Sequence, residues 1–202
     1  MYKIAVLVSG SGSNLEAIID SINKGELNCA IQVVISDREE AYGLERAKNN
    51  NINTYTFSRK KYGDKLSNEI LKVVEGKVDL IVLAGFLSIL KGDILDIFKN
   101  KIINIHPSLL PLFCGSNMYG IKVHEKVIES GTKVSGCSVH YVDASIDTGK
   151  IILQKTVPVH WDDTPEILQK RVLIEEHRAL SEVIKMKISE SEARMKWKRE
   201  QL

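Results

Sequence analysis

Residues 3–14 have the sequence KIAVLVSGSGSN, a short apolar run that ends in a loop of glycine and serine. The run Lys3–Val8 has no polar alternation, which is typical of a strand covered on both faces. The loop opens a helix predicted over Asn14–Ser21. A buried strand that turns through glycines into a helix is the beginning of a β-α-β unit, so this stretch predicts an α/β protein.

The same alternation of strand and helix continues through the first half of the chain. Further strands are predicted at Ile31–Ile35, Asn53–Phe57, Leu80–Leu83 and Ile102–Ile105, and further helices at Gly43–Lys48, Lys65–Val74 and Ile94–Phe98. Such alternation produces parallel strands, because each helix returns the chain across one face through a right-handed crossover. We therefore expect an open, mostly parallel, twisted sheet with helices on both faces, a Rossmann-like architecture.

The pattern changes after Pro111. A helix is predicted at Gly120–Glu129, and two more strands at Ser138–Val142 and Ile151–Val157. The short connection between these strands has no room for a crossover helix, so the pair is expected to be antiparallel. The last helix is predicted to begin at Thr164, a good N-cap that is followed by proline.

Composition indicates one globular domain. The chain has 202 residues, of which 44% are hydrophobic and 27% charged. The net charge is +2, and residues 185–202 alone carry +3, from six Lys or Arg and three Glu. The near-neutral body has no basic footprint for nucleic acid. We expect a domain over residues 1–188 and a basic tail over 189–202, which is a solvated helix end or a frayed terminus.

Three cysteines, an odd number without a C-x-x-C pair, indicate reduced thiols and a cytoplasmic protein. The N-terminal segment has no signal-peptide pattern, and no apolar run approaches the roughly 18 residues of a membrane span. None of the five histidines has the spacing of a zinc site. The sequence therefore predicts no membrane partner and no metal.

Chemistry is first suggested by the loop Ser9–Leu15. Glycines let a backbone approach a ligand closely, and the free N–H groups at a helix start attract phosphate. The loop differs from the dinucleotide fingerprint because Leu15 stands in place of the third glycine, and it lacks the lysine of a P-loop. The structural alternative is a tight turn with a serine cap.

A second candidate is the segment around Asn104 and His106 at the end of a predicted strand. Both side chains share one face, because side chains alternate with period two. Ligands bind at the carboxyl ends of parallel strands, and Asn or protonated His can stabilise an oxyanion. Asp147, in the loop Asp143–Gly149, is able to orient a histidine. The alternatives are a histidine that ends a strand and an aspartate that bonds its own turn.

Together these segments resemble the glycinamide ribonucleotide formyltransferases of purine synthesis. The matches keep their order over about residues 2–184. They are Val8–Leu15 (VSGSGSNL), Gly43–Ala47 (GLERA), Leu83–Phe86 (LAGF), Asn104–Pro111 (NIHPSLLP), Ser138–Val142 (SVHYV), Asp147–Gly149 (DTG), Ile151–Gln154 (IILQ) and Glu176-His177. The NIHPSLLP run with a later Asp is common to folate-dependent formyltransferases, and the N-terminal GSGSNL loop narrows the resemblance to this branch and its deformylase relative.

The resemblance implies a Rossmann-like formyltransferase fold and a direct formyl transfer. The amine of glycinamide ribonucleotide would attack the formyl group of 10-formyltetrahydrofolate through a tetrahedral intermediate, with Asn104, His106 and Asp147 as the catalytic residues. Asn104 and protonated His106 would stabilise the oxyanion, and Asp147 would hold His106 cationic. No activated Ser or Cys is required.

The resemblance also implies where each substrate binds. The ribonucleotide would contact Gly12, Ser13, Asn14 and Glu176. The folate would lie against Leu87, Ser88, Ile89 and Leu90, against Asn104, and against the loop residues Asp143, Ala144, Ser145 and Ile146, with Arg59 at an outer position. No metal is implied.

Two stretches depart from the family pattern. Ser88 stands where the family often has an arginine, which removes a charge contact to the folate tail. The loop that contains Cys114 is about five residues longer than usual. His124 is a candidate replacement for a family histidine of that loop.

Three other functions remain open at this stage. Formyltetrahydrofolate deformylases transfer formyl to water, but they carry an N-terminal regulatory domain that this sequence does not show. Formyltransferases that act on initiator tRNA have a basic C-terminal domain, and others act on sugar nucleotides. A silent nucleotide- or folate-binding module would not require Asn104, His106 and Asp147 together. We expect the protein to act as a monomer or a homodimer.

Overall fold

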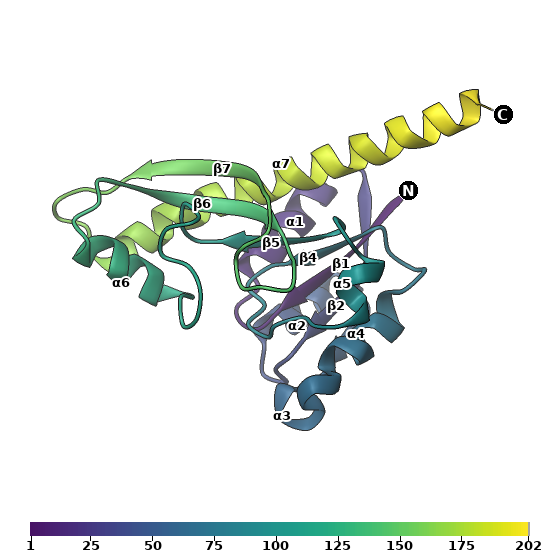
Figure 1. Ribbon diagram of the computed structural model, residues 1–202, viewed down its shortest axis with the longest axis horizontal. Coiled ribbons are helices and arrows are strands. Elements are labelled where there is room, and N and C mark those ends of the chain that lie inside the picture. The colour runs from purple at the N-terminus through teal and green to yellow at the C-terminus, as the bar shows by residue number, and fades with distance from the viewer. Residues whose placement is uncertain (202) are drawn as a thin grey trace.

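A computed structural model describes residues 1–201 of the chain. One seven-stranded sheet runs through it in the order β3-β2-β1-β4-β5-β6-β7 (Figure 1). The strands are β1 (Tyr2–Val8), β2 (Cys29–Ser36), β3 (Thr54–Thr56), β4 (Leu80–Leu83), β5 (Ile102–His106), β6 (Val134–Tyr141) and β7 (Ile151–Pro158). The helices are α1 (Ser13–Asn23), α2 (Tyr42–Asn49), α3 (Arg59–Tyr62), α4 (Leu66–Val74), α5 (Asp93–Ile97), α6 (Ile121–Glu129) and α7 (Pro165–Glu200).

Strands β1 to β5 form the parallel part of the sheet, as the sequence predicts. Strand β1 pairs with β2 on one side and with β4 on the other. Its side chains alternate between two cores. Ile4, Val6 and Val8 pack in one core, and Ala5 and Leu7 pack in the other. A strand buried on both faces needs no polar alternation, which explains the continuous apolar run.

The last two strands are antiparallel, which confirms the second prediction about the sheet. β6 pairs antiparallel with both β5 and β7. Two glycines make the close approach possible. A Cβ added at Gly136 would lie 1.9 Å from the Lys155 carbonyl oxygen, and one added at Gly149 would lie 1.7 Å from the Tyr141 carbonyl oxygen. Gly149 therefore lets the loop after β6 fold back against the strand.

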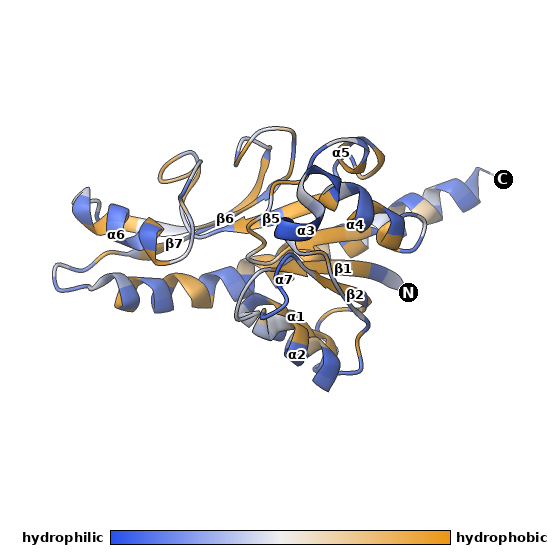
Figure 2. Cartoon of the chain, turned by 90° about the horizontal axis from the view of Figure 1, so that it is seen from below, coloured by the Kyte–Doolittle hydropathy of each residue, from blue (hydrophilic) through white to orange (hydrophobic). Residues whose placement is uncertain are grey.

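Helices cover both faces of the sheet. α1, α2 and α7 lie on one face, and α4 and α5 lie on the other (Figure 2). The three-layer arrangement buries apolar residues on either side of β1 and β4, so the loops at the carboxyl ends of these strands rest on a rigid base.

Several element boundaries differ from those predicted. Strand β3 has only three residues because it is an edge strand whose residues are half-buried or exposed. Strand β6 begins at Val134, four residues before the predicted start.

Thr164 is the N-cap of α7, as predicted, and its Oγ1 accepts from the Ile167 N–H at 3.4 Å. Residues 189–200 form the last turns of α7, which project past the sheet (Figure 1).

Within residues 1–201, every helix is too short or too polar to cross a membrane.

Candidate active site

The candidate site lies at the carboxyl ends of β1, β4 and β5. The loops that follow β1 and β4 are tied together there. Ser9 donates its N–H to the Gly85 carbonyl at 3.0 Å, and its Oγ accepts from the Leu87 N–H at 2.8 Å. This edge is where open α/β sheets bind their ligands.

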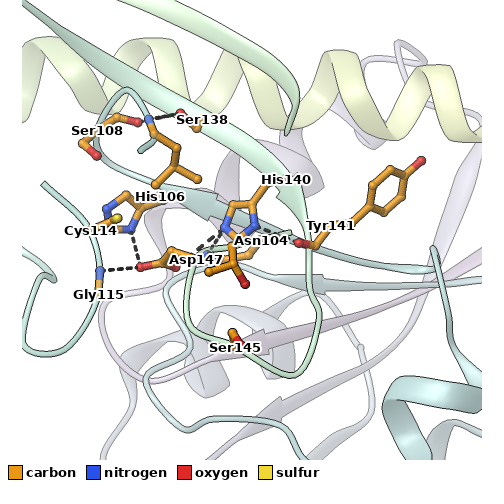
Figure 3. A network of polar contacts seen from close by, with 12 residues as sticks. Asn104, His106, Ser108, Cys114, Gly115, Ser138, His140, Tyr141, Ser145 and Asp147 are labelled. Atoms are coloured by element: carbon orange, nitrogen blue, oxygen red, sulfur yellow. Dashed lines mark hydrogen bonds and ion pairs between the residues drawn. The ribbon is translucent and has the colours of Figure 1, made fainter. Parts of the chain in front are cut away.

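His106 is the last residue of β5, and its ring faces the Asp147 carboxylate (Figure 3). Nε2 donates to the Phe113 carbonyl oxygen at 2.9 Å, and Nδ1 lies 3.8 Å from Oδ2 of Asp147. The residue is only 4% exposed. Because its partner is a carbonyl oxygen, Nε2 carries a hydrogen, whereas Nδ1 is too far from the Asp147 carboxylate for a direct hydrogen bond.

Asp147 reaches the site from the loop between β6 and β7. Its φ of 57° is left-handed, and Oδ2 accepts from the Gly115 N–H at 3.0 Å. The same loop is closed by Asp143, whose Oδ1 accepts from the Ser145 N–H at 3.0 Å and from Thr148 Oγ1 at 2.8 Å. The turn therefore places the Asp147 carboxylate beside His106, as the sequence analysis expected of this loop.

Asn104 faces His140 across the β5–β6 pair. The two residues are register partners, and Asn104 Nδ2 lies 3.0 Å from His140 Nε2. His140 Nδ1 donates to the Tyr141 carbonyl at 2.8 Å, and burial lowers the pKa of His140. The ring is thus neutral with a free lone pair on Nε2, which accepts one Asn104 N–H. The second N–H of the Asn104 amide remains for a ligand.

The sequence analysis did not assign a site role to His140. Its Nε2 lies 3.7 Å from Oδ1 of Asp147, so it belongs to the same cluster (Figure 3). The signal was present in the SVHYV stretch, but its use required the β5–β6 register. An antiparallel partner of Asn104 can be read off only when the pairing is known.

In the loop before α1, the backbone carbonyl oxygens of residues 10–12 are hydrogen-bonded within the described part of the chain, whereas the backbone N–H groups of residues 10–15 are not. The carbonyls of Gly10, Ser11 and Gly12 accept from Gly43 N–H, Arg46 Nε and Glu16 N–H at 2.9 to 3.0 Å. Within residues 1–201, the N–H groups of residues 10–15 have no acceptor in the protein. A loop of free N–H groups at a helix N-terminus favours an anion. The N-cap is Gly12 without a side-chain cap, so the serine-cap alternative is wrong.

Asn14 and Glu176 join this loop to α7. Asn14 Nδ2 donates to Glu176 Oε2 at 2.8 Å, and both residues are buried. Burial raises the pKa of Glu176, and the hydrogen bond from Asn14 acts in the opposite direction. The Oδ1 atom of Asn14 is buried without a partner. The predicted ribonucleotide residues Gly12, Ser13, Asn14 and Glu176 therefore come together.

The structure does not bring all of the predicted folate residues together: the segment 87–90, the loop 143–146 and Arg59 lie in three places. The segment 87–90 is irregular, and Ser88 Oγ donates to Asp37 Oδ2 at 2.6 Å, so its hydroxyl faces β2. Leu90 is buried, whereas Ile89 is 48% exposed. The residues Asp143, Ala144, Ser145 and Ile146 belong to the loop that carries Asp147. Arg59 begins α3 beyond the edge strand β3, and β2, β1 and β4 separate that edge from β5.

The long loop after β5 lies beside His106 and Asp147. Its Phe113 and Gly115 backbone groups bind His106 and Asp147. Cys114 Sγ donates to the Pro111 carbonyl at 3.2 Å, and burial and Asp147 raise the pKa of its thiol. A thiol with a raised pKa is a poor nucleophile. His124 is 1% exposed, and burial together with His106 lowers its pKa to about 4.

No group of three His, Cys, Asp or Glu side chains within residues 1–201 is arranged to hold a metal ion.

This fold and site define an α/β protein with an anion loop at one strand end and an acid–base cluster at another. Comparison with known proteins identifies the class. Residues 2–184 match the Formyl transferase family model, and the chain belongs to this family. The match confirms the resemblance drawn from the sequence.

Two of the relatives described here are named for glycinamide ribonucleotide formylation, and one is a deformylase. Phosphoribosylglycinamide formyltransferase of Arabidopsis thaliana is 40% identical over 97% of this chain and 68% of its own length. The crystal structure of glycinamide ribonucleotide transformylase 1 from Symbiobacterium toebii superposes with a TM-score of 0.83 at 44% identity, over 92% of this chain and 86% of that one. A formyltetrahydrofolate deformylase from Pseudomonas syringae gives a TM-score of 0.82 at 25% identity, over 91% of this chain and 60% of that one.

Proposed function

We propose that this protein transfers the formyl group of 10-formyltetrahydrofolate to the amine of glycinamide ribonucleotide, a step of purine biosynthesis. The single observation that carries the proposal is the arrangement of Asn104, His106 and Asp147 at the ends of β5 and β6. The relatives named above point to the same reaction.

The geometry supports a direct attack. The amine adds to the formyl carbon, and the carbonyl oxygen becomes an oxyanion. The free N–H of Asn104 and the Nε2–H of His106 are the donors for this oxyanion, and the oxyanion replaces the Phe113 carbonyl as the partner of Nε2. The Asp147 carboxylate stabilises the His106 cation. The attacking amine then loses a proton toward Asp147. As the carbonyl re-forms, the bond between the formyl carbon and the folate nitrogen breaks, and that nitrogen takes up the proton to leave as tetrahydrofolate.

The substrates occupy the two sides of this cluster. The ribonucleotide phosphate binds the N–H groups of Gly12, Ser13 and Asn14, and the ribose hydroxyls bind Glu176. The folate lies between the segment 87–90 and the loop 143–146, whose backbone groups pair with the polar edge of a pterin. The Ser88 hydroxyl is already hydrogen-bonded to Asp37. Among the predicted folate residues, the folate tail is therefore recognised by Arg59 or by none of them.

Formyltetrahydrofolate deformylase is the second candidate function, because one such enzyme shares the fold. A deformylase uses water as its acceptor and needs no ribonucleotide site. The deformylase of known structure is 25% identical to this chain, whereas the two transferases named above are 40% and 44% identical. These identities support the transferase over the deformylase.

We also propose that the protein acts in the cytoplasm, as a monomer or homodimer, without nucleic-acid or membrane partners. Cys29, Cys114 and Cys137 are free thiols, which fits a reducing compartment. Sedimentation of the purified protein measures its oligomeric state.

The decisive experiment mixes the protein with 10-formyltetrahydrofolate and follows the release of tetrahydrofolate by absorbance. The transferase releases it only when glycinamide ribonucleotide is present. Release without the ribonucleotide identifies a deformylase. Absence of release under both conditions contradicts the proposal and favours a silent binding module.

A further inference from the structure

We propose that Arg46 on α2 is a positioning residue for the phosphate site: it turns the Ser11 carbonyl away so that the Gly12 N–H points toward the anion. The inference rests on the proposed function, because it concerns the loop that we assign to the ribonucleotide phosphate. It adds a residue outside the loop, 35 positions away in the sequence, that decides which backbone atoms the loop presents.

The peptide group is planar, which fixes the relative directions of its carbonyl and its N–H. In a trans peptide, the carbonyl of one residue and the N–H of the next point in opposite directions. The Ser11 carbonyl accepts from Arg46 Nε at 2.9 Å. The N–H of Gly12 therefore points away from α2. The Gly10 carbonyl accepts from the Gly43 N–H at 3.0 Å, so the Ser11 N–H also points away from α2.

Arg46 holds this position through three separate contacts. Besides Ser11, its Nη1 lies 2.8 Å from Oε2 of Glu16 in the first turn of α1. The central carbon of its guanidinium also lies over the Tyr42 ring, 5.0 Å from the ring centroid. A planar guanidinium can donate in two directions while one face rests on an aromatic ring, which an ammonium group cannot do. Arg46 thus clamps the loop, α1 and α2 together.

Close packing shows that α2 is built against the loop. A Cβ added at Gly12 would lie 2.6 Å from the Gly43 Cα, and a Cβ added at Gly43 would lie 2.9 Å from Val8 Cγ2. Gly12 also has a φ of 71°, a conformation that favours glycine. The GLERA stretch therefore supplies Gly43 for the approach and Arg46 for the hydrogen bond.

Loss of the Arg46 hydrogen bond frees the Ser11–Gly12 peptide to rotate. A rotated peptide would present a carbonyl oxygen to the phosphate in place of an N–H. The result is weaker binding of phosphate compounds, whereas the formyl-transfer cluster on β5 and β6 is untouched. The expected effect is therefore a lower affinity for the ribonucleotide and an unchanged affinity for the folate.

The test replaces Arg46→Met and compares it with Lys48→Met. Both changes remove one positive charge from α2, but within residues 1–201 the Lys48 ammonium pairs with the exposed Glu45 and forms no hydrogen bond or ion pair with the loop. Calorimetry with ribose 5-phosphate measures phosphate-site affinity without turnover. We expect Arg46→Met to weaken binding at least about tenfold, or about 1.4 kcal/mol. Lys48→Met is expected to bind like the unaltered protein.

Kinetics and a third variant separate positioning from general damage. Arg46→Met should raise KM for glycinamide ribonucleotide by the same factor and leave KM for 10-formyltetrahydrofolate in place. Arg46→Lys should recover part of the loss, because an ammonium can reach one of the two acceptors. Equal losses in Arg46→Met and Lys48→Met would reduce the effect to net charge and overturn the inference, as would unchanged affinity in Arg46→Met.

The inference and the proposed function fail in different ways. If the unaltered protein does not formylate the ribonucleotide, the proposed function is wrong, yet the ribose 5-phosphate titration still reports on the loop. If the unaltered protein turns over normally and Arg46→Met binds ribose 5-phosphate equally well, only the role of Arg46 is wrong. Thermal unfolding of each variant verifies that the comparison is made between folded proteins.

Discussion

His106 combines burial with two polar partners that the chain brings from different loops. Phe113 supplies a carbonyl to one ring nitrogen, and Asp147 places a carboxylate near the other. A ring held in this way is already oriented before a substrate arrives, and a substrate oxygen has only to replace the Phe113 carbonyl at Nε2. No other side chain in the cluster can donate a proton from the same place.

Replacing His106→Ala should lower kcat by about 10²- to 10⁴-fold, the usual contribution of acid–base catalysis. Formyl transfer followed by absorbance at saturating concentrations of both substrates measures the loss. Cys114→Ser serves as a control in the same loop region and should retain turnover, because its thiol is not activated. Near-normal turnover of His106→Ala would remove His106 from the mechanism.

The types of residue in the site were predictable, whereas their partners were not. Asn104 and His106 lie two positions apart on a strand, so the period of the strand puts them on one face. The contacts of His140 and of Arg46 depend on strand register and on helix packing, which join residues 35 or more positions apart. Local sequence patterns carry no information about such distances.

The same contrast holds for helices and strands. The strands of the parallel part were predictable because burial on both faces leaves an uninterrupted apolar run. The early start of β6 was not predictable from the sequence. Gly136 stands among small residues, and its place in the strand is explained by the close approach of the Lys155 backbone in the folded sheet. The short β3 is the opposite case, because fewer residues pair than the sequence predicts. The segment Thr54–Thr56 has the β-branched and aromatic residues of a strand, but it lies at the edge of the sheet and has one neighbouring strand.

Helix α6 carries a buried histidine whose charge depends on folding. Burial and His106 lower the pKa of His124 to about 4, while in an unfolded chain it is about 6.5. Between these values the unfolded chain binds the proton and the folded protein does not. The free energy of unfolding should therefore fall as the pH drops from about 6.5 toward 4.

Thermal unfolding of His124→Leu at pH 7.5 and pH 5 tests this dependence. The variant should lose less Tm on acidification than the unaltered protein, because the unfolded chain no longer gains that proton. His160→Leu provides the matched control, since His160 is exposed in the segment between β7 and α7. An identical acid loss in His124→Leu and the unaltered protein would contradict the assignment.

Helix α7 has a packed part and a solvated part. Lys187 is buried, and its Nζ contacts the Tyr141 hydroxyl and lies 2.7 Å from Oε2 of Glu190. Residues 192–201 are exposed. Truncation after Ser191 should leave Tm and turnover unchanged, because it removes no buried contact.

Truncation after Ile188 removes Glu190 and leaves the buried Lys187 ammonium with only the Tyr141 hydroxyl. This shorter chain should have a lower Tm, by about 2 to 4 °C for each 1 kcal/mol lost. Thermal unfolding of the two truncated chains measures the difference. Equal Tm values would show that the domain can end at residue 188, as the sequence analysis expects.

At the level of the whole molecule, the site joins segments from opposite ends of the chain. The loop before α1 meets α7 through the Asn14–Glu176 hydrogen bond, which links residues 162 positions apart. The catalytic cluster lies on β5, β6 and the loop before β7. A ligand that spans these parts binds only when all of them are assembled, so its binding energy is added to the stability of the whole fold.

Glycinamide ribonucleotide at 100 times its Kd should therefore raise the free energy of unfolding by about 2.7 kcal/mol. For a chain of this size, that corresponds to an increase in Tm of about 5 to 10 °C. Glu176→Gln should reduce the increase at the same ribonucleotide concentration. Its amide oxygen still accepts from Asn14, but the carboxylate that would hold the ribose hydroxyls is gone.

Thermal unfolding with each substrate alone separates the two halves of the site. The ribonucleotide shift should shrink in Glu176→Gln, whereas the shift given by a folate should not, because the loop 143–146 borders α7 at Lys187 and Glu190, beyond Glu176. If Glu176→Gln lowered both shifts equally, the change would act through the fold and not through the ribose. An unchanged ribonucleotide shift would place the ribose elsewhere, and the phosphate on the loop before α1 would then be the only anchor of the acceptor.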